Sequence, residues 1–225
     1  MNKKGFTLIE IIVVMAIIAT LATVGSFGIK NFSKAQGVST AVPIAQGVMS
    51  LAKSAAMRRP SRSRLLIHAT NDPTNTLHRE RYLRYMIIQT LNYGPNNNND
   101  TPSNVSVAAG DDFWEFTSRG TFLPQNAWFI PSLSNQVGHE IPIIENVTLP
   151  GNSVSRCYYY EFNSQGILTN PSVGVLAPRF IISGGAMPPG SPEPIRQADD
   201  RNVGGFVIWK KGTTSKIRHP DQIGL

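Results

Sequence analysis

The chain has 225 residues and a formal net charge of +7; 41% of its residues are hydrophobic and 16% are charged. This composition supplies enough apolar surface for a sizeable core and excludes a chain that is disordered throughout. The single cysteine, Cys157, excludes an intramolecular disulfide and a zinc site built on paired cysteines.

The positive charge is concentrated toward the N-terminus. Nine of the 21 basic side chains, but only one of the 14 acidic ones, lie in residues 1–64. The rest of the chain is close to charge balance, which argues against a nucleic-acid surface that covers the whole protein. Membrane phospholipid is the simplest partner for the basic N-terminal part.

Residues 6–29 form an apolar run in which Glu10 is the only charged side chain. As a helix this run extends about 36 Å, which is enough to cross the hydrocarbon core of a bilayer. Lys3 and Lys4 precede it, so the positive-inside rule predicts a cytoplasmic N-terminus and translocation of everything after Ile29. Glu10 is unexpected, because a charge at the centre of a membrane helix costs about 2.5–3.5 kcal/mol.

Three interpretations fit this segment. A secretory signal peptide would use Lys3 and Lys4 as its basic region, but the apolar run is too long and no clean small-residue cleavage site follows. A plain signal anchor explains the length and leaves Glu10 unexplained. The third interpretation starts from the letters KGFTLIE at residues 4–10, which IIVVMAIIATLA follows directly.

These letters resemble the N-terminal signal of the type IV pilin and pseudopilin family. The resemblance implies that residues 1–5 are a leader, that prepilin peptidase cuts between Gly5 and Phe6 on the cytoplasmic side, and that Phe6 is N-methylated. Glu10 is then the fifth mature residue, four positions after the new amine and on the same helix face. An amine and a carboxylate cost less in hydrocarbon as a pair than apart. The pair forms within one chain or, as the family implies, between adjacent subunits.

Helical periodicity continues through residues 30–57, which predicts an amphipathic continuation of the N-terminal helix. Two neighbouring rows of apolar side chains follow the helical spacing. The first row is Val38, Val42, Ala45, Met49, Ala52 and Ala56, and the second is Ala41, Ile44, Val48, Leu51 and Ala55. The polar stripe of Gln46, Ser50 and Lys53 is narrow, so this helix should be covered on most sides, either by a sheet and neighbouring helices or within a single domain.

Helix breakers interrupt this pattern. Gly28, Gly37 and Pro43 predict a bend or local unwinding within residues 28–43, because glycine costs about 1 kcal/mol and proline about 3 kcal/mol in a helix interior. Pro60 predicts the end of the helix, because it pushes Arg59 toward extended geometry.

Beyond Pro60, short runs rich in β-branched and aromatic residues alternate with turn residues. The candidate strands are residues 63–69, 82–91, 112–117, 127–133, 140–149, 157–163, 178–183 and 204–211. They predict an α+β fold, in which one long N-terminal helix packs on a mostly antiparallel β head, residues 58–225. The polar loops at 71–78, 93–104 and 184–202 are expected to be mobile or extended linkers.

Within the family, the head is similar to the H-type minor pseudopilins of type II secretion and the T-type fimbrial minor pilins. The stretches that carry this resemblance are residues 51–67, 113–124, 158–168 and 205–218. The resemblance implies an aromatic strand that ends in a glycine turn near Phe162 and Gly166, and a last strand that closes the sheet. Glu10 distinguishes the chain from the tip-type pseudopilin, which lacks this residue.

Catalysis is not expected, and neither is a cofactor. No metalloprotease, nucleophile-elbow or phosphate-loop motif occurs, and the histidines are scattered. They are His68, His78, His139 and His219.

Calcium is a minor option, because some major pseudopilins hold it in a C-terminal loop. Asp199 and Asp200 offer oxygen ligands near two glycines, but Arg196 and Arg201 oppose a cation there. A solvated acidic turn is the simpler interpretation.

Two basic clusters are candidates for contact with nucleic acid or lipid. They are Arg58, Arg59, Arg62 and Arg64 near the helix end, and Lys210, Lys211, Lys216 and Arg218 near the C-terminus. The simpler interpretation places the arginines near lipid headgroups or neighbouring subunits and the lysines at solvated strand ends.

The sequence therefore predicts a non-enzymatic structural subunit of a type II secretion pseudopilus or type IV pilus-like filament that serves protein export. Its expected partners are prepilin peptidase, other subunits through the N-terminal helix, and the bacterial inner membrane, with the head in the periplasm. The alternative function is a DNA-binding minor pilin of a DNA-uptake pilus.

Overall fold

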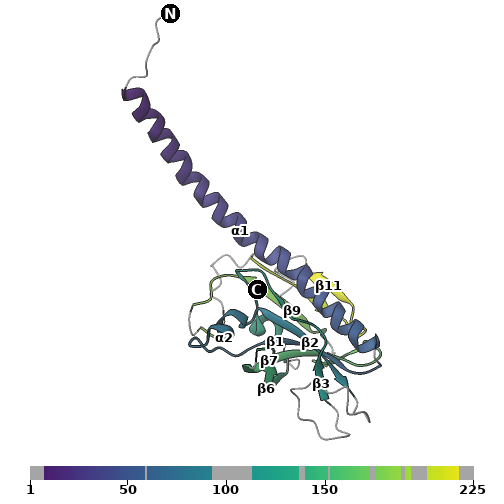
Figure 1. The fold of residues 1–225 in the computed structure, drawn as a ribbon. Helices are drawn as coiled ribbons and strands as arrows, with labels where there is room; N and C mark the ends of the chain where they lie inside the picture. The colour runs from purple at the N-terminus through teal and green to yellow at the C-terminus, as the bar shows by residue number, and fades with distance from the viewer. Residues whose placement is uncertain are drawn as a thin grey trace, which may run out of the picture.

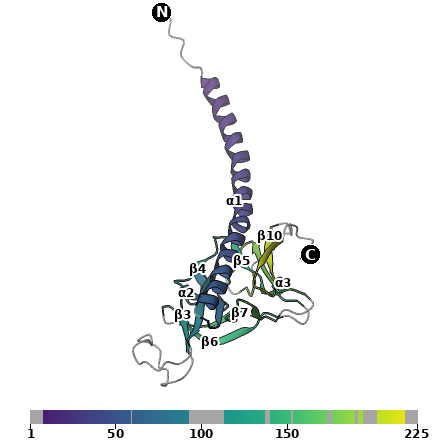
Figure 2. The same cartoon turned by 90° about the vertical axis from the view of Figure 1, so that its right-hand side faces the viewer.

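The computed structural model describes residues 8–58, 60–92, 113–136, 140–151, 153–172, 176–188, 191–193 and 202–217, without the side chains of residue 10 and residues 20–36. A single long helix, α1 (Leu8–Arg58), precedes a head of short strands. The C-terminal half of α1 lies across the head, and its N-terminal half projects away from it (Figures 1 and 2). The chain is thus an α+β protein with antiparallel sheets, as the sequence predicts.

Helix α1 is helical throughout its length, so the local unwinding predicted for residues 28–43 is wrong. The other predicted alternative was a bend, and Figure 2 shows a gentle curve along the helix. Pro43 lies on the exposed side of the helix, while Val42 and Ala45 beside it are buried in the head. This packing offsets the cost of the proline.

The first apolar row of α1 is buried along its whole length, as predicted. All six of its side chains, from Val38 to Ala56, are at most 6% exposed. In the second row Ala41 and Val48 are buried, whereas Leu51 is 58% exposed. The helix is therefore covered by the head on one broad face and leaves Leu51 open.

Among the residues that the structure describes, no helix offers a stretch both long enough and apolar enough to cross a membrane. The predicted span, residues 6–29, lies partly outside the described residues, which do not include residues 6 and 7 or the side chains of residues 10 and 20–29.

The head consists of two antiparallel sheets. In the seven-stranded sheet the order is β3-β2-β1-β7-β6, with β4 beside β2 and β8 beside β7; in the four-stranded sheet it is β11-β10-β9-β5. The first sheet contains β1 (Ser63–His68), β2 (Tyr85–Asn92), β3 (Phe113–Phe116), β4 (Thr121–Phe122), β6 (Ile143–Leu149), β7 (Ser153–Phe162) and β8 (Leu168–Asn170). The second contains β5 (Ala127–Phe129), β9 (Arg179–Gly184), β10 (Val203–Ile208) and β11 (Thr214–Ile217).

Each candidate strand overlaps an observed one, but 127–133 is only partly a strand. Its first half is β5, and its second half is the short helix α3 (Pro131–Ser134). Pro131 explains the switch, because a proline has no amide hydrogen for a strand ladder and fits the first turn of a helix.

A second short helix, α2 (Thr76–Arg81), begins in a loop that the sequence predicts to be a linker. The side-chain oxygen of Asn75 accepts hydrogen bonds from the amides of Leu77 and His78, at 3.0 and 3.4 Å. This N-cap satisfies amides that would otherwise lack partners and so starts the helix. Helix α2 packs at the end of β1, far from the end of α1 (Figure 1).

One described part of the proline-rich loop, residues 191–193, is held to the head by side chains. The Tyr82 hydroxyl donates to the carbonyl of Pro192, and Asn71 Nδ2 donates to that of Ser191 at 2.8 Å. The carboxylate of Glu193 accepts from the amide and hydroxyl of Ser132 at 3.0 and 2.7 Å. This part of the predicted linker is therefore fixed in place.

Candidate functional site

Several predicted site residues lie outside the described residues. These are Gly5, Phe6, Arg59, Asp199, Asp200 and Arg218. Glu10 lies within α1, but its side chain is not described. Their assignments remain sequence predictions.

Arg64, a predicted candidate for contact with nucleic acid or lipid, is buried inside the head. It is 8% exposed, and its Nε donates to Gln89 Oε1 at 2.8 Å. Its guanidinium lies 3.8 Å from the centre of the Trp114 ring, as in a cation–π contact. Burial lowers the pKa of Arg64 to about 10. Such a side chain supports the sheet and does not meet a phosphate.

Arg62 is likewise engaged with its own chain. Its Nε donates to Glu161 Oε1 at 2.8 Å, and the two side chains form an ion pair. The Glu161 side chain is 3% exposed, so losing Arg62 would leave a buried carboxylate without this counter-charge. Both arginines of strand β1 and the turn before it therefore belong to the sheet architecture.

The end of α1 rests on two glycine turns, one between β7 and β8 and one between β10 and β11. Gly166 and Gly212 have φ angles of 72° and 67°, in the left-handed region that favours glycine. A Cβ on Gly166 would lie 2.9 Å from Met57 Sδ, and one on Gly212 would lie 2.5 Å from the carbonyl oxygen of Gly166. Both would also meet the Lys53 stem. The glycines thus let both turns approach the helix closely.

These three segments form a basic tip. We define the tip by residues 51–58, 163–167 and 209–213, which contain Lys53, Arg58, Lys210 and Lys211 and no acidic residue. Arg58, Lys210 and Lys211 are exposed, and Trp209 is 49% exposed. The structure therefore brings three predicted contact residues to one end of the head and adds Lys53, which the sequence placed in the polar stripe of the helix.

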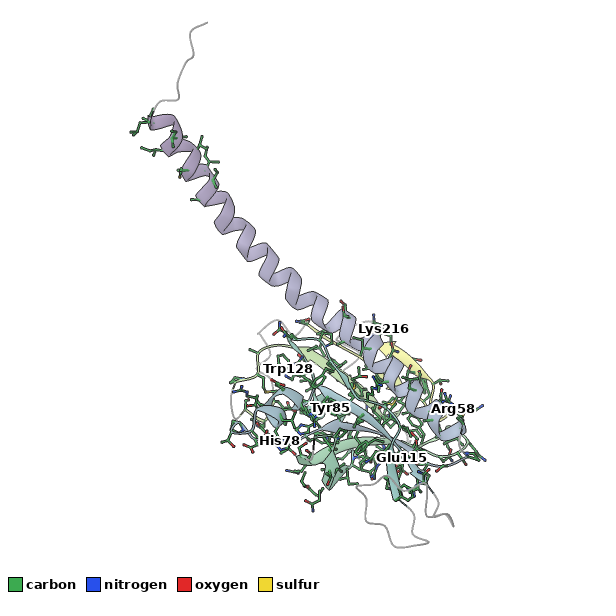
Figure 3. The ribbon with its side chains drawn as sticks, viewed as in Figure 1. Arg58, His78, Tyr85, Glu115, Trp128 and Lys216 are labelled. Carbon is green, nitrogen blue, oxygen red and sulfur yellow. The ribbon has the colours of Figure 1, made fainter. Side chains whose placement is uncertain are left out.

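Lys216 lies away from this tip. Gln46 Nε2 donates to Thr214 Oγ1 at 3.3 Å, which places β11 beside α1 about three turns before the helix end. Figure 3 shows Lys216 well separated from Arg58 along the helix.

A groove of about 330 Å³ opens between the last turns of α1 and strands β2 and β3. Leu51, Ala55 and Ile88 give it an apolar lining, while Arg58 and Glu115 contribute opposite charges. Glu115 Oε2 accepts from Asn92 Nδ2 at 2.8 Å. Figure 3 shows Arg58 and Glu115 at the same end of the head.

Two of the histidines that appear scattered in the sequence meet in the structure. His68 Nε2 lies 3.0 Å from His78 Nδ1, and the two side chains are 1% and 7% exposed. No sequence motif predicts this histidine pair, because the contact depends on how α2 packs at the end of β1. In Figure 3, His78 lies at the end of the head opposite Arg58.

Within the described part of the chain, no group of three or more histidine, cysteine, aspartate or glutamate side chains is placed to hold a metal ion.

Comparison with known proteins gives one match. Residues 1–26 match the family model of the prokaryotic N-terminal methylation motif. No curated protein sequence and no solved structure matches the chain. The match confirms a prepilin-type signal at the N-terminus, with the features of a prepilin-peptidase substrate of the type IV pilin and pseudopilin kind.

Proposed function

From the prepilin-type signal at residues 1–26, we propose that the chain is a structural subunit of a type IV pilus-like filament, in the first instance the pseudopilus of a type II secretion system. The match to the methylation motif carries this proposal. The fold supports it, because α1 leads from the end of that motif without interruption into the core of the head. The function is docking between subunits and not turnover of a substrate.

Processing and assembly follow from the chemistry of the first residues. Prepilin peptidase cleaves after Gly5, and the Phe6 amine that this exposes is methylated. The cation at Phe6 then pairs with Glu10 of an adjacent subunit in the bilayer, where each charge alone would cost several kcal/mol. Residues 6–29 anchor the subunit in the inner membrane, and the head lies in the periplasm.

The geometry of α1 separates the tip from the membrane. From residue 29 to Arg58 the helix rises roughly 43 Å. The Debye length at physiological ionic strength is about 8 Å, so lipid headgroups of the anchoring membrane would not attract the basic tip. The tip and its groove are better suited to other macromolecules, including neighbouring subunits.

A substitution at Glu10 tests the assembly step. The Glu10→Val variant should be cleaved and remain in the membrane fraction but be lost from sheared filaments, because it lacks the partner of the Phe6 amine. Immunoblots of membrane and filament fractions measure both outcomes. Gly5→Val serves as a control that should stay uncleaved and therefore unassembled. Normal incorporation of Glu10→Val would contradict the proposal.

The basic tip supports a second candidate, a DNA-binding minor pilin. Lys210 and Lys211 directly follow the exposed Trp209, and nucleic acids are recognised by basic side chains that contact phosphates and aromatic rings that stack on bases. In a gel-shift assay of the full chain in detergent, Lys210→Gln/Lys211→Gln should weaken binding, while Arg79→Gln on the distant α2 should not. An absence of binding at low salt would reject this candidate.

A further inference from the structure

The His68–His78 pair is buried at the contact between α2 and the end of β1. In a hydrogen bond between two imidazoles one nitrogen donates and the other accepts, so the bond needs at least one neutral ring. If both rings were protonated, two N–H groups would face each other. His68 Nδ1 is buried and has no hydrogen-bond partner, so nothing there would stabilise a second proton on this ring.

The groups around the pair are mostly cationic or neutral. Arg81 on α2 is 9% exposed; its Nη1 donates to Ser153 Oγ on β7 at 3.2 Å, and its guanidinium lies 4.7 Å from the centre of the Tyr85 ring on β2. Cys157 on β7 is the cross-strand neighbour of His68 and is buried.

The described acids near the pair lie in water. Asp72, in the loop before α2, is partly exposed, accepts hydrogen bonds from Thr74 and interacts electrostatically with His78. Arg79 and Glu80 are exposed residues of α2 itself. Burial, followed by the proximity of His78 and Arg81, lowers the pKa of His68 from 6.5 to about 3.

Besides the contacts of Arg81 with Ser153 and Tyr85, two hydrogen bonds directly after α2 hold this region in place. The amide of Leu83 donates to the His68 carbonyl at 2.9 Å, and the Tyr82 hydroxyl donates to the Pro192 carbonyl. The 191–193 segment thus depends partly on Tyr82, directly after α2. A loss of the histidine contact therefore loosens α2 and this segment together.

We propose that the His68–His78 pair is an acid-sensitive latch, which docks α2 and the 191–193 segment when His68 is neutral and releases them when it is protonated. The proposal goes beyond the filament function and does not depend on it. The pH of the medium around the head acts directly on the pair. A fall in this pH would open the latch and expose the surface that α2 covers.

The direction follows from proton linkage. Opening returns the pKa of His68 from about 3 to its ordinary 6.5, so the open form binds one more proton in that window. The opening constant is lowest above pH 6.5, and below it the constant rises with a slope that approaches tenfold for each pH unit. Between pH 6.5 and 4.5 the opening constant should therefore rise about 50-fold, because half of the open form is already protonated at pH 6.5.

Hydrogen exchange of the full chain in detergent, measured by mass spectrometry and corrected for intrinsic rates, tests the latch. Peptides covering α2 and the 191–193 segment should lose protection about 50-fold between pH 6.5 and 4.5, while peptides of β9 keep theirs. In the double variant His68→Gln/His78→Asn, whose amides replace the two bonded nitrogens, the opening constant should not depend on pH. Unchanged protection of α2 in the wild type, or an equal loss in the double variant, would overturn the proposal.

Two further measurements keep the test decisive. Tyr82→Phe removes the contact with Pro192 without removing a group that titrates in this range, so it should raise opening by the same factor at every pH. If the double variant fails to fold, NMR of ring-labelled histidine in the wild-type chain replaces it. The His68 resonance should titrate well below pH 6.5, because the docked form excludes the proton, and a midpoint near pH 6.5 would overturn the latch.

Discussion

Single residues decide which basic side chains are available at the surface. In the sequence, Arg58, Arg62 and Arg64 form one cluster, yet their surroundings differ: Arg58 is exposed, Arg62 pairs with Glu161, and Arg64 is stacked on Trp114. The sequence could not separate them, because the partners of Arg62 and Arg64 are supplied by strands β2, β3 and β7, far along the chain. The strand itself was predicted, but the identity of its cross-strand neighbours was not.

Arg64→Lys should lower the free energy of unfolding by about 2 kcal/mol, because an ammonium group loses the planar stacking on Trp114 and the directed bond to Gln89. Urea denaturation followed by circular dichroism measures the change. The matched variant Arg58→Lys, at an exposed position, should stay within about 0.5 kcal/mol of the wild type. Equal effects of the two variants would mean that the buried contacts of Arg64 contribute nothing.

The longer and more regularly patterned a helix or strand is, the more of it could be predicted from the sequence. The buried row of α1 follows from the spacing of its apolar residues alone, and the longer strands follow from their β-branched and aromatic runs. The short elements α2, β4, β8 and β11 were not among the predicted helices and strands. Their residues are largely polar, and contacts such as the Asn75 cap or the Gln46–Thr214 hydrogen bond hold them in place.

The glycine turns under the end of α1 give a prediction at this scale. A left-handed φ costs an alanine roughly 1–2 kcal/mol. Gly212→Ala should lower the free energy of unfolding by more than this, because its Cβ would also lie 2.5 Å from a backbone oxygen. Gly47→Ala should instead raise it by about 0.5–1 kcal/mol, since Gly47 is an exposed helical position with no atom within 4 Å of the new Cβ. Thermal melts of the two variants measure this opposite pair of shifts. A destabilised Gly47→Ala would contradict the account of α1.

At the scale of the whole molecule, the two sheets and α1 share one core. The ring of Phe180 on β9 lies 5.7 Å from that of Tyr160 on β7 and 5.1 Å from that of Phe206 on β10, which joins the sheets through aromatic contacts. Helix α1 packs over both sheets. The α+β class was predictable from the order of patterns, but the division into two sheets was not, because pairing between distant strands leaves no local mark in the sequence.

This shared core predicts a single cooperative unfolding transition. Trp114 reports on the seven-stranded sheet and Trp128 on the four-stranded sheet. In variants that keep one of these tryptophans and carry phenylalanine at the other two positions, the urea midpoint of the fluorescence change should equal the midpoint from circular dichroism of the same variant. If the urea midpoints from fluorescence and from circular dichroism differ in either variant, the two sheets unfold independently.

The unbroken course of α1 also has a mechanical consequence. Its projecting half and its buried half are one rod, so tension applied near Leu8 reaches the row from Val38 to Ala56 as shear along the helix axis. Contacts loaded in shear must slip together, whereas contacts loaded at one end peel apart one by one. Tension on α1 therefore loads all of its contacts with the head at once, and the helix does not separate from the head one contact at a time.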